Sequence, residues 1–401
     1  MSFDAPTRRP VPHRLAIIIT IVSANMLALA ATDLYLPSVP YLPEILGTSI
    51  EGVQFTLVAF SIGFALSQIL FGAAGDLWNR RWVLVGSLAV FVPASAWCAL
   101  SGSAEGLIAA RVLQGFAASA SATLTVPMIK PLFDEARAVH AISVIGGVDA
   151  IIPALAPILG AWIFFQFGWA ANFWVIVIIG VPILGAAIWY VPNDRPESPH
   201  TSIWPVLMGY FILLRHKAFM GYAVSHGFSL GGLLAVVFST PTLIVEHMGG
   251  GPAQYVYVQV IWVAIFLIAA SMTGRLMARF TADGLIWLGN FIQIASAVAL
   301  LIYALVADNP HWLGLALCGL PYCIGLGLRG GAGFSRAIDA VPNYGARASS
   351  LIIFFSMALT AVGTGAIAPF LEEGLLGAGI IMLVMSIAAL GVLTLIRGRG
   401  E

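Results

Sequence analysis

Residues 52–101 read GVQFTLVAFSIGFALSQILFGAAGDLWNRRWVLVGSLAVFVPASAWCALS, two apolar runs joined by a short polar turn. Each run has about 20 residues, the length that an α-helix needs to cross the hydrocarbon of a bilayer. The turn holds one acid, Asp76, and two adjacent cations, Arg80 and Arg81. The stretch therefore predicts two membrane-spanning helices that are joined at the membrane surface.

The same alternation of long apolar runs and polar gaps continues along the chain. Of its 401 residues, 60% are hydrophobic and only 9% are charged, which excludes an ordinary soluble domain. We predict an all-α membrane protein with twelve transmembrane helices. The predicted spans are 15–36, 52–73, 82–101, 105–127, 139–164, 170–191, 218–241, 254–277, 283–305, 312–333, 347–370 and 375–396.

One polar gap is much longer than the others and divides the spans into two equal sets. It begins VPNDRPESP at residue 191, and a segment this polar does not cross a membrane. We therefore predict two six-helix bundles, 15–191 and 218–396, joined by a central cytoplasmic loop, 192–217. Cytoplasmic tails are predicted at 1–14 and 397–401. A duplicated body of this kind suggests a transporter with its pathway between the bundles.

The cations predict the orientation. Apart from Arg111 and Arg329, every Lys and Arg lies in alternate gaps, on the side that holds both termini. Because translocation of Lys and Arg is unfavourable, both termini are predicted to be cytoplasmic. No small-residue cleavage site closes the first apolar run, so we interpret that run as a signal anchor.

Several classes of function find no support in the sequence. The formal net charge of zero argues against nucleic-acid binding, and the three cysteines have neither metal-ligand nor disulfide spacing. There is no HExxH and no Walker loop, and residues 325–330 match GxGxxG only inside an apolar span. We expect no enzyme, no catalytic residue, no metal and no cofactor. Without an ATPase domain, transport would be driven by a gradient.

The turn GAAGDLWNRR, which starts at Gly72, resembles the loop signature of the major facilitator superfamily. Asp76, Arg80 and Arg81 match that signature, whereas Asn79 stands where Gly is usual. We expect Asp76 to pair with Arg80, Arg81 or a neighbouring helix terminus and so to latch the cytoplasmic side. Because Asn tolerates positive φ, we expect the turn to be kept.

Two further motifs support the resemblance. Residues 111–118, RVLQGFAA, are similar to the intramembrane arginine signature of the same superfamily. Residues 153–161, PALAPILGA, resemble the Pro/Gly-rich motif of its antiporter branch. Prolines in mid-helix remove backbone hydrogen bonds, so Pro153 and Pro157 are expected to bend the helix unless neighbours compensate.

Together with TDLYLP at residues 32–37, these motifs make the chain similar to the twelve-span drug:proton antiporters, with the bicyclomycin and chloramphenicol resistance group as the nearest match. The resemblance implies the major facilitator fold and a proton gradient as the driving force. The antiporter motif favours export.

Asp33, Arg111, Asp149 and His226 are the ionisable residues that we place well inside the predicted spans. Charge at such depth is unfavourable, so these groups usually face a cavity and mark a pathway. Asp33 and Arg111 fall at similar depth near the outer ends of their spans. Our hypothesis is that Asp33 exchanges protons and that Arg111 tunes it. The alternatives are a carboxylate exposed at the helix end and an arginine bonded to backbone carbonyls.

Asp149 falls near mid-membrane, where the resemblance predicts no acid. It could be a second proton site, a counter-charge for a cationic substrate, a partner of Arg111 or His226, or a protonated acid bonded to the backbone. His226 could relay protons or remain a neutral hydrogen-bonding residue. Arg329, near the cytoplasmic end of its span, is interpreted as an anchor that reaches the interface.

Two sets of residues complete the predicted sites. Amphipathic drugs need broad apolar contact with a few polar groups, which predicts a substrate set of Asn25, Tyr35, Asp149, His226 and Gln259. Each of these residues could instead form a helix–helix hydrogen bond. The predicted conformational set is Gly72, Asp76, Arg80, Arg81, Gln114, Gly115, Pro153, Pro157 and Gly160.

The leading hypothesis is a proton-coupled antiporter of the bacterial inner membrane that exports hydrophobic or cationic drugs. The alternative is a proton-linked transporter of one metabolite, such as a sugar, an amino-acid derivative or a siderophore. The expected partners are the substrate, protons and the lipid bilayer, and the chain is expected to be a monomer. Two acids and one arginine inside the membrane favour a cation or a neutral compound over an anion.

Overall fold

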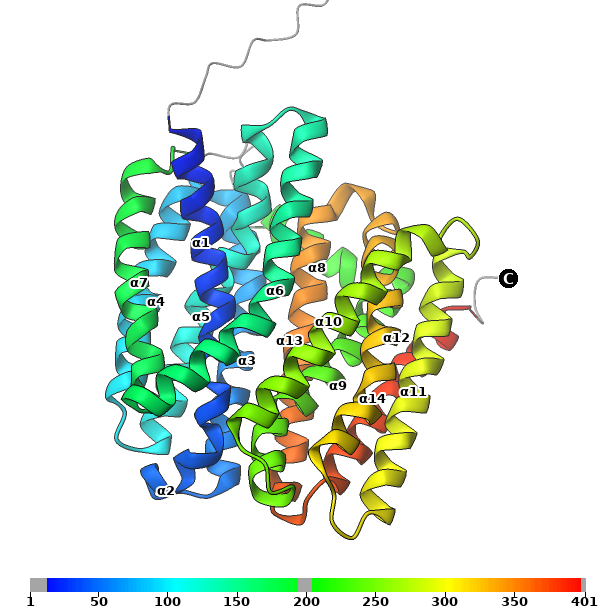
Figure 1. Cartoon of the computed structure of the whole chain (residues 1–401). Helices are drawn as coiled ribbons and strands as arrows, with labels where there is room; N and C mark the ends of the chain where they lie inside the picture. The colour runs from blue at the N-terminus through cyan, green and yellow to red at the C-terminus, as the bar shows by residue number, and fades with distance from the viewer. Residues whose placement is uncertain (1–12, 194–203, 398–401) are drawn as a thin grey trace, which may run out of the picture.

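The computed structural model describes residues 13–193 and 204–397, and all regular structure in these two ranges is helical (Figure 1). Most of the predicted tails and residues 194–203 of the predicted central loop lie outside the described residues. The N-terminal half comprises α1 (Arg14–Asp33), η1 (Leu36–Tyr41), α2 (Leu42–Leu46), α3 (Ile50–Leu77), α4 (Arg80–Leu100), α5 (Ala104–Ile129), η2 (Lys130–Leu132), α6 (Glu135–Phe167) and α7 (Trp169–Tyr190).

The C-terminal half follows a linker helix, α8 (Trp204–Arg215). It comprises α9 (Lys217–His247), α10 (Pro252–Leu276), α11 (Ala282–Val306), α12 (Trp312–Asp339), η3 (Pro342–Tyr344), α13 (Gly345–Ile367), η4 (Ala368–Glu373) and α14 (Leu376–Arg397). Twelve stretches of the described chain are long and apolar enough to span a membrane. The predicted all-α, twelve-span fold is therefore confirmed.

The span boundaries agree with the predictions to within a few residues at most ends. The first stretch is the main exception, since it continues to Leu46 rather than residue 36. η1 and α2 extend it, with prolines at the starts of both short helices, where a missing N–H is tolerated. The predicted loop 192–217 was also wrong in one respect, because it contains α8. That helix has only 12 residues, too few to be recognised as a span.

The two halves lie side by side, with the N-terminal half at the left of Figure 1 and the C-terminal half at the right. α3 packs against α13 and α6 against α10 across the seam between them. An even number of spans returns the chain to its starting side, so α1 begins and α14 ends on one face. We call it the terminal face, and the other the opposite face.

Small residues allow the helices of the N-terminal half to approach closely. A Cβ added at Gly115 of α5 would lie 2.2 Å from the Phe60 carbonyl oxygen of α3, and one at Gly63 would lie 2.2 Å from that of Val112. At Gly160 of α6 the corresponding distance, to the Leu34 oxygen, is 2.1 Å. Such contacts are typical of tightly packed membrane helices. Only glycine fits at these positions.

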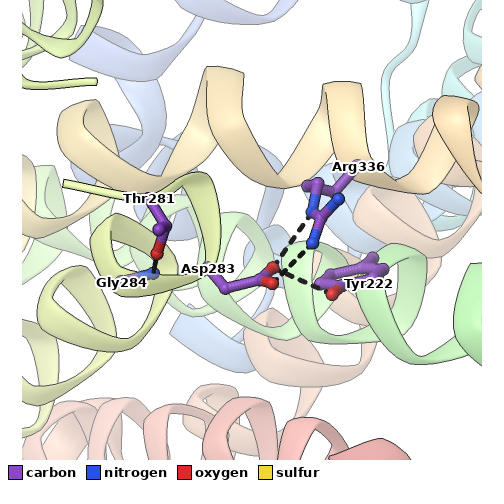
Figure 2. Close-up of polar contacts among 5 residues, drawn as sticks. All are labelled: Tyr222, Thr281, Asp283, Gly284 and Arg336. Atoms are coloured by element: carbon purple, nitrogen blue, oxygen red, sulfur yellow. Dashed lines mark hydrogen bonds and ion pairs between the residues drawn. The ribbon is translucent and has the colours of Figure 1, made fainter. Parts of the chain in front are cut away.

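Helix starts are capped by short polar side chains. Ser49, Ser103 and Thr281 accept hydrogen bonds from the backbone N–H three residues later; Figure 2 shows the Thr281–Gly284 bond. These bonds satisfy N–H groups that have no partner within the helix. Asn79 has the same function at α4, where it accepts from Arg81 N. Its φ is −65°, so Asn79 keeps the turn by capping α4 and not, as expected, by tolerating a positive φ.

Pro153 and Pro157 do not end α6, which runs without a break from Glu135 to Phe167. The helix is supported there by α1, because Gly160 packs directly against the end of that helix. Any conformational role of the two prolines stays a prediction.

Candidate functional site

Arg111 lies at the core of the N-terminal half and is fully buried. Its guanidinium donates to the Ala31 carbonyl oxygen at 3.2 Å, to Thr32 Oγ1 at 3.1 Å and to Gln114 Oε1 at 2.7 Å. It also lies 4.3 Å from the centre of the Phe60 ring. These neutral partners hold α1 and α5 together, as the packing alternative for Arg111 predicts.

Asp33 is the last residue of α1 and is half-buried. Arg111 bonds to Ala31 and Thr32, the two residues that precede Asp33. The end of α1 and the side of α5 that carries Arg111 therefore face each other. The Asp33 carboxylate interacts electrostatically with Arg111 and Tyr255, but no ion pair within 4.0 Å joins Asp33 to Arg111. The carboxyl group is therefore near a cation without being held by it. Its role in proton exchange stays a prediction.

Asp149 has a different partner from those proposed for it. Asn25 Nδ2 of α1 donates a 2.7 Å hydrogen bond to Asp149 Oδ1 of α6. Asn25 is buried, whereas Asp149 is only half-buried. The structure thus brings together two residues of the predicted substrate set, and places neither Arg111 nor His226 against this acid.

Tyr35 and Gln259 are both buried. The Tyr35 hydroxyl shares a 2.9 Å hydrogen bond with Thr56 Oγ1 of α3, and its ring packs 5.2 Å from that of Phe173. Tyr35 therefore connects three helical segments of the N-terminal half. Its predicted contact with substrate, and that of Gln259 on α10, remain untested.

The halves are joined at the opposite face by a neutral contact. Gln54 Nε2 of α3 donates to Ser239 Oγ of α9 at 3.3 Å, and both side chains are buried. Nearby, η1 packs against α9 and α10. Ser239 gave no signal in the sequence, because a single serine in an apolar span does not reveal which helix it faces.

The halves are joined at the terminal face by a charged contact. Arg347 Nε, at the start of α13, lies 3.1 Å from Asp76 Oδ2 at the end of α3. Of the alternatives for Asp76, the structure therefore shows the neighbouring helix terminus. Arg80 donates instead to the Gly75 carbonyl oxygen at 3.2 Å, and Arg81 donates to that of Ile188.

Gly72 and Gln114 complete the picture of the predicted conformational set. A Cβ at Gly72 would lie 2.7 Å from Ser350 Oγ of α13, so this glycine permits the seam to close at the terminal face. Gln114 donates from Nε2 to Ser95 Oγ of α4 at 2.8 Å while accepting from Arg111. It is a link within the N-terminal half.

Arg329 is not the interfacial anchor that the sequence suggested. It is fully buried in the C-terminal half, where it donates to Asn290 Oδ1 and to Ser225 Oγ, each at 2.8 Å. The anchor interpretation considered only its distance from the helix end. Asn290 was a usable signal, because a polar residue in a neighbouring span can satisfy a buried guanidinium.

His226 is half-buried and close enough to Arg329 to interact with it electrostatically. Its ring packs edge-on against that of Phe334 at 6.1 Å, and its Nδ1 atom forms no hydrogen bond with the described residues. A relay role for His226 stays a prediction.

A second charged cluster lies at the terminal face, within the C-terminal half (Figure 2). Arg336 forms two hydrogen bonds with Asp283, at 3.1 and 2.6 Å, and the Tyr222 hydroxyl donates to the same carboxylate at 2.9 Å. This cluster ties α9, α11 and α12 together. It does not cross the seam between the halves.

The described residues contain no group of three or more His, Cys, Asp or Glu side chains that could hold a metal. Inside the helical body, Arg111, Arg329 and Asp149 each have neutral hydrogen-bond partners. Asp33 and His226 instead lie near the charges of Arg111 and Arg329.

Comparison with known proteins agrees with this geometry. The family model of the Major Facilitator Superfamily matches residues 21–364. The multidrug resistance protein MdtL of Escherichia coli O139:H28 is 26% identical over 244 residues, which are 61% of this chain and 62% of that protein. The same holds for MdtL of Shigella boydii serotype 18. The match thus spans less than two thirds of these relatives.

Solved structures share the fold at low sequence identity. A bacterial homolog of the human lysosomal transporter Spinster, inward-facing and occupied, has a TM-score of 0.73 at 14% identity and covers 98% of each chain. A D-xylose–proton symporter has a TM-score of 0.71 at 13% identity and covers 96% of this chain and 99% of its own. From the family match and the twelve helices, we conclude that this chain belongs to the Major Facilitator Superfamily.

Proposed function

We propose that the chain is a proton-coupled antiporter that exports hydrophobic or cationic compounds by alternating access. The observation that carries this proposal is the Asn25–Asp149 hydrogen bond of 2.7 Å inside the N-terminal half. An acid at membrane depth is unfavourable and usually functional. Asp149 has a neutral amide as its partner and keeps part of its surface exposed, so a proton can be gained or lost without breaking an ion pair.

Asp33 is the second proposed proton site. Nothing in the described structure pairs it directly with a cation, and Arg111 is close enough to influence its charge state. Arg111 itself is held by neutral groups on α1 and α5. In the proposed mechanism Arg111 positions the end of α1, and Asp33 titrates beside it.

Alternating access requires the halves to separate at one face at a time. The two contacts suited to this are the Asp76–Arg347 pair at the terminal face and the Gln54–Ser239 bond at the opposite face. Neither involves the proposed proton sites. Opening one face would then break one contact and leave the other intact, while the substrate and the proton exchange in the interior.

The substrate class is supported by two observations of different weight. The likeness to multidrug resistance protein MdtL favours amphipathic drugs. The interior charges alone favour cations less than the sequence suggested, because Arg329 is buried and adds a second positive charge to that of Arg111. Neutral amphipathic compounds are therefore included. We also propose that the protein resides in the bacterial inner membrane, as a monomer with both termini in the cytoplasm.

The alternative is a proton-linked transporter of one metabolite. The D-xylose–proton symporter shares the fold, but at 13% identity that likeness says nothing about the substrate. A single-metabolite transporter would respond to one member of a compound panel, whereas a drug exporter would respond to several unrelated members.

The decisive experiment measures proton release from inverted membrane vesicles when lipophilic cations, neutral antibiotics and sugars are added. Asp149→Asn and Asp33→Asn are the test variants. Glu105→Gln is the matched control, because it also neutralises an acid but lies exposed in the first turn of α5. We expect drugs to evoke proton release that Asp149→Asn abolishes and Glu105→Gln preserves. Release that survives in both Asp variants would refute the assigned sites.

A further inference from the structure

The linker helix α8 has an apolar surface that no part of the described chain covers. Its 12 residues, WPVLMGYFILLR, carry one charge, at the C-terminal end. The outward side chains recur at helical spacing and form what we call the outer stripe: Leu207, Phe211 and Leu214, which are 41%, 48% and 47% exposed. A helix that faces water would carry polar residues on that side.

The inner face of α8 contacts both halves at the terminal face. Val206, Tyr210 and Leu213 are buried in a hydrophobic cluster with Ala73 of α3 and Leu351 of α13. α3 belongs to the N-terminal half and α13 to the C-terminal half, so this cluster spans the seam. α8 is thus placed where a movement of either half must disturb it.

Two glycines show how closely α8 is fitted into the seam. A Cβ at Gly209 of α8 would lie 2.3 Å from Nη1 of Arg347, the residue that pairs with Asp76. A Cβ at Gly72 of α3 would lie 2.5 Å from the Tyr210 hydroxyl. α8 therefore supports the charged contact between the halves from outside.

We propose that α8 is an interfacial lipid-binding helix, and that the contact of its outer stripe with the bilayer holds the terminal face closed. The helix connects two spans and lies at one membrane face, too short to cross and apolar enough to enter the lipid. The partner is the lipid of the bilayer itself. Lipid contact fixes the depth of α8, and that depth sets the fit of its inner face in the seam.

The charges at the end of α8 fit this partner. Arg215 and Lys217 are exposed, and the Arg215 guanidinium lies 4.1 Å from the centre of the Phe211 ring. A cation next to an apolar stripe can reach the headgroup phosphates while the stripe stays among the acyl chains. α8 thus combines an apolar stripe for the acyl chains with cations at its C-terminal end for the headgroups.

The depth of α8 can be measured directly. The full-length chain, with its three native cysteines replaced by alanine, carries a spin label at Phe211→Cys and is reconstituted into liposomes. We expect collisions with oxygen, which concentrates in lipid, to exceed those with a water-soluble nickel complex. A label at Glu105→Cys serves as the aqueous reference. A Phe211 label with the aqueous profile would overturn the proposal.

The effect on the seam is tested with a pair of labels, at Trp78→Cys of the N-terminal half and Asp339→Cys of the C-terminal half. Leu207→Glu with Phe211→Glu should weaken the lipid contact, and we expect the ratio of long to short label distances to rise by about tenfold. The matched control is Trp189→Glu, an 83% exposed apolar residue near the end of α7. Equal distance distributions in the double variant and in the control would overturn the proposal, even if transport by the proposed mechanism is established.

Discussion

The two halves of the molecule each bury an arginine, and they surround it differently. In the N-terminal half, Arg111 has three hydrogen-bond acceptors, an aromatic ring beneath it and the carboxyl of Asp33 nearby. In the C-terminal half, Arg329 has two acceptors, and the ends of the helices hold the acids of that half, as in the Asp283–Arg336 cluster. The N-terminal half thus places one titratable acid, Asp33, near its arginine.

The difference suggests that the two arginines have different roles. A charge inside a membrane is energetically unfavourable, so each arginine must form contacts that offset this cost. The packing of Arg111 links the helix that ends at Asp33 to α5. The packing of Arg329 links α9, α11 and α12. We therefore expect the first arrangement to serve the proposed proton sites and the second to serve packing.

The largest effect should follow from Arg111→Met, which keeps the apolar stem and removes the charge. We expect a loss of about 3–5 kcal/mol in the free energy of unfolding, because Thr32, Gln114 and a backbone carbonyl lose their donor and each unsatisfied acceptor costs about 1–3 kcal/mol. Thermal unfolding in detergent measures this effect. If Arg111→Met were as stable as the unmodified protein, the prediction that Arg111 stabilises the fold more than Arg329 would be wrong.

Arg329→Met should destabilise less, by about 1–2 kcal/mol. Two acceptors lose their donor rather than three, and both side chains stay anchored by the bonds that they donate, from Asn290 to the Ile286 carbonyl oxygen and from Ser225 to that of Ala389. No acid is left without its cation. The same unfolding assay applies, together with drug-evoked proton release, which should persist. Loss of proton release in a variant that stays folded would assign Arg329 to the pathway.

Gln54→Ala tests the seam rather than either half. It removes the 3.3 Å hydrogen bond to Ser239 at the opposite face. We expect the contact between the halves to be weakened by about 1 kcal/mol. Distances between labels at the opposite face should lengthen while those at the terminal face stay unchanged. If both faces respond equally, the halves do not move as independent bodies.

The smallest effect is expected for Asp283→Asn in the cluster of Figure 2. Its side chain and that of Arg336 are 41% and 45% exposed, so the pair is well screened and should contribute only about 0.5–1 kcal/mol. Stability measured in low and high salt would show this pair weakening with ionic strength. If Asp283→Asn lowered the free energy of unfolding more than Arg329→Met does, the exposed ion pair would contribute more than the buried arginine, contrary to this prediction.

The fold was predictable from the sequence because span length and cation placement are properties of each segment alone. Pairings across the seam were not, because they depend on how each helix is rotated about its axis. Asn25 and Asp149 lie 124 residues apart, and no local pattern connects them. α8 was missed for a different reason: the polar residues before it outweighed 12 apolar ones in deciding that the segment is a loop.

The pKa of Tyr210 decides whether this residue makes the contact between the halves at the terminal face respond to pH. Burial in the seam, with a smaller contribution from the charge of Asp76, raises the pKa of its phenol to about 12. Below pH 10 the phenol is neutral in both the folded and the unfolded chain, so it adds no pH dependence to stability there; its contribution is lost only as the pH rises further. In the proposed mechanism the protein works between compartments of different acidity, and this phenol at its terminal face does not sense that difference. That mechanism assigns proton exchange to the carboxyl groups of Asp33 and Asp149.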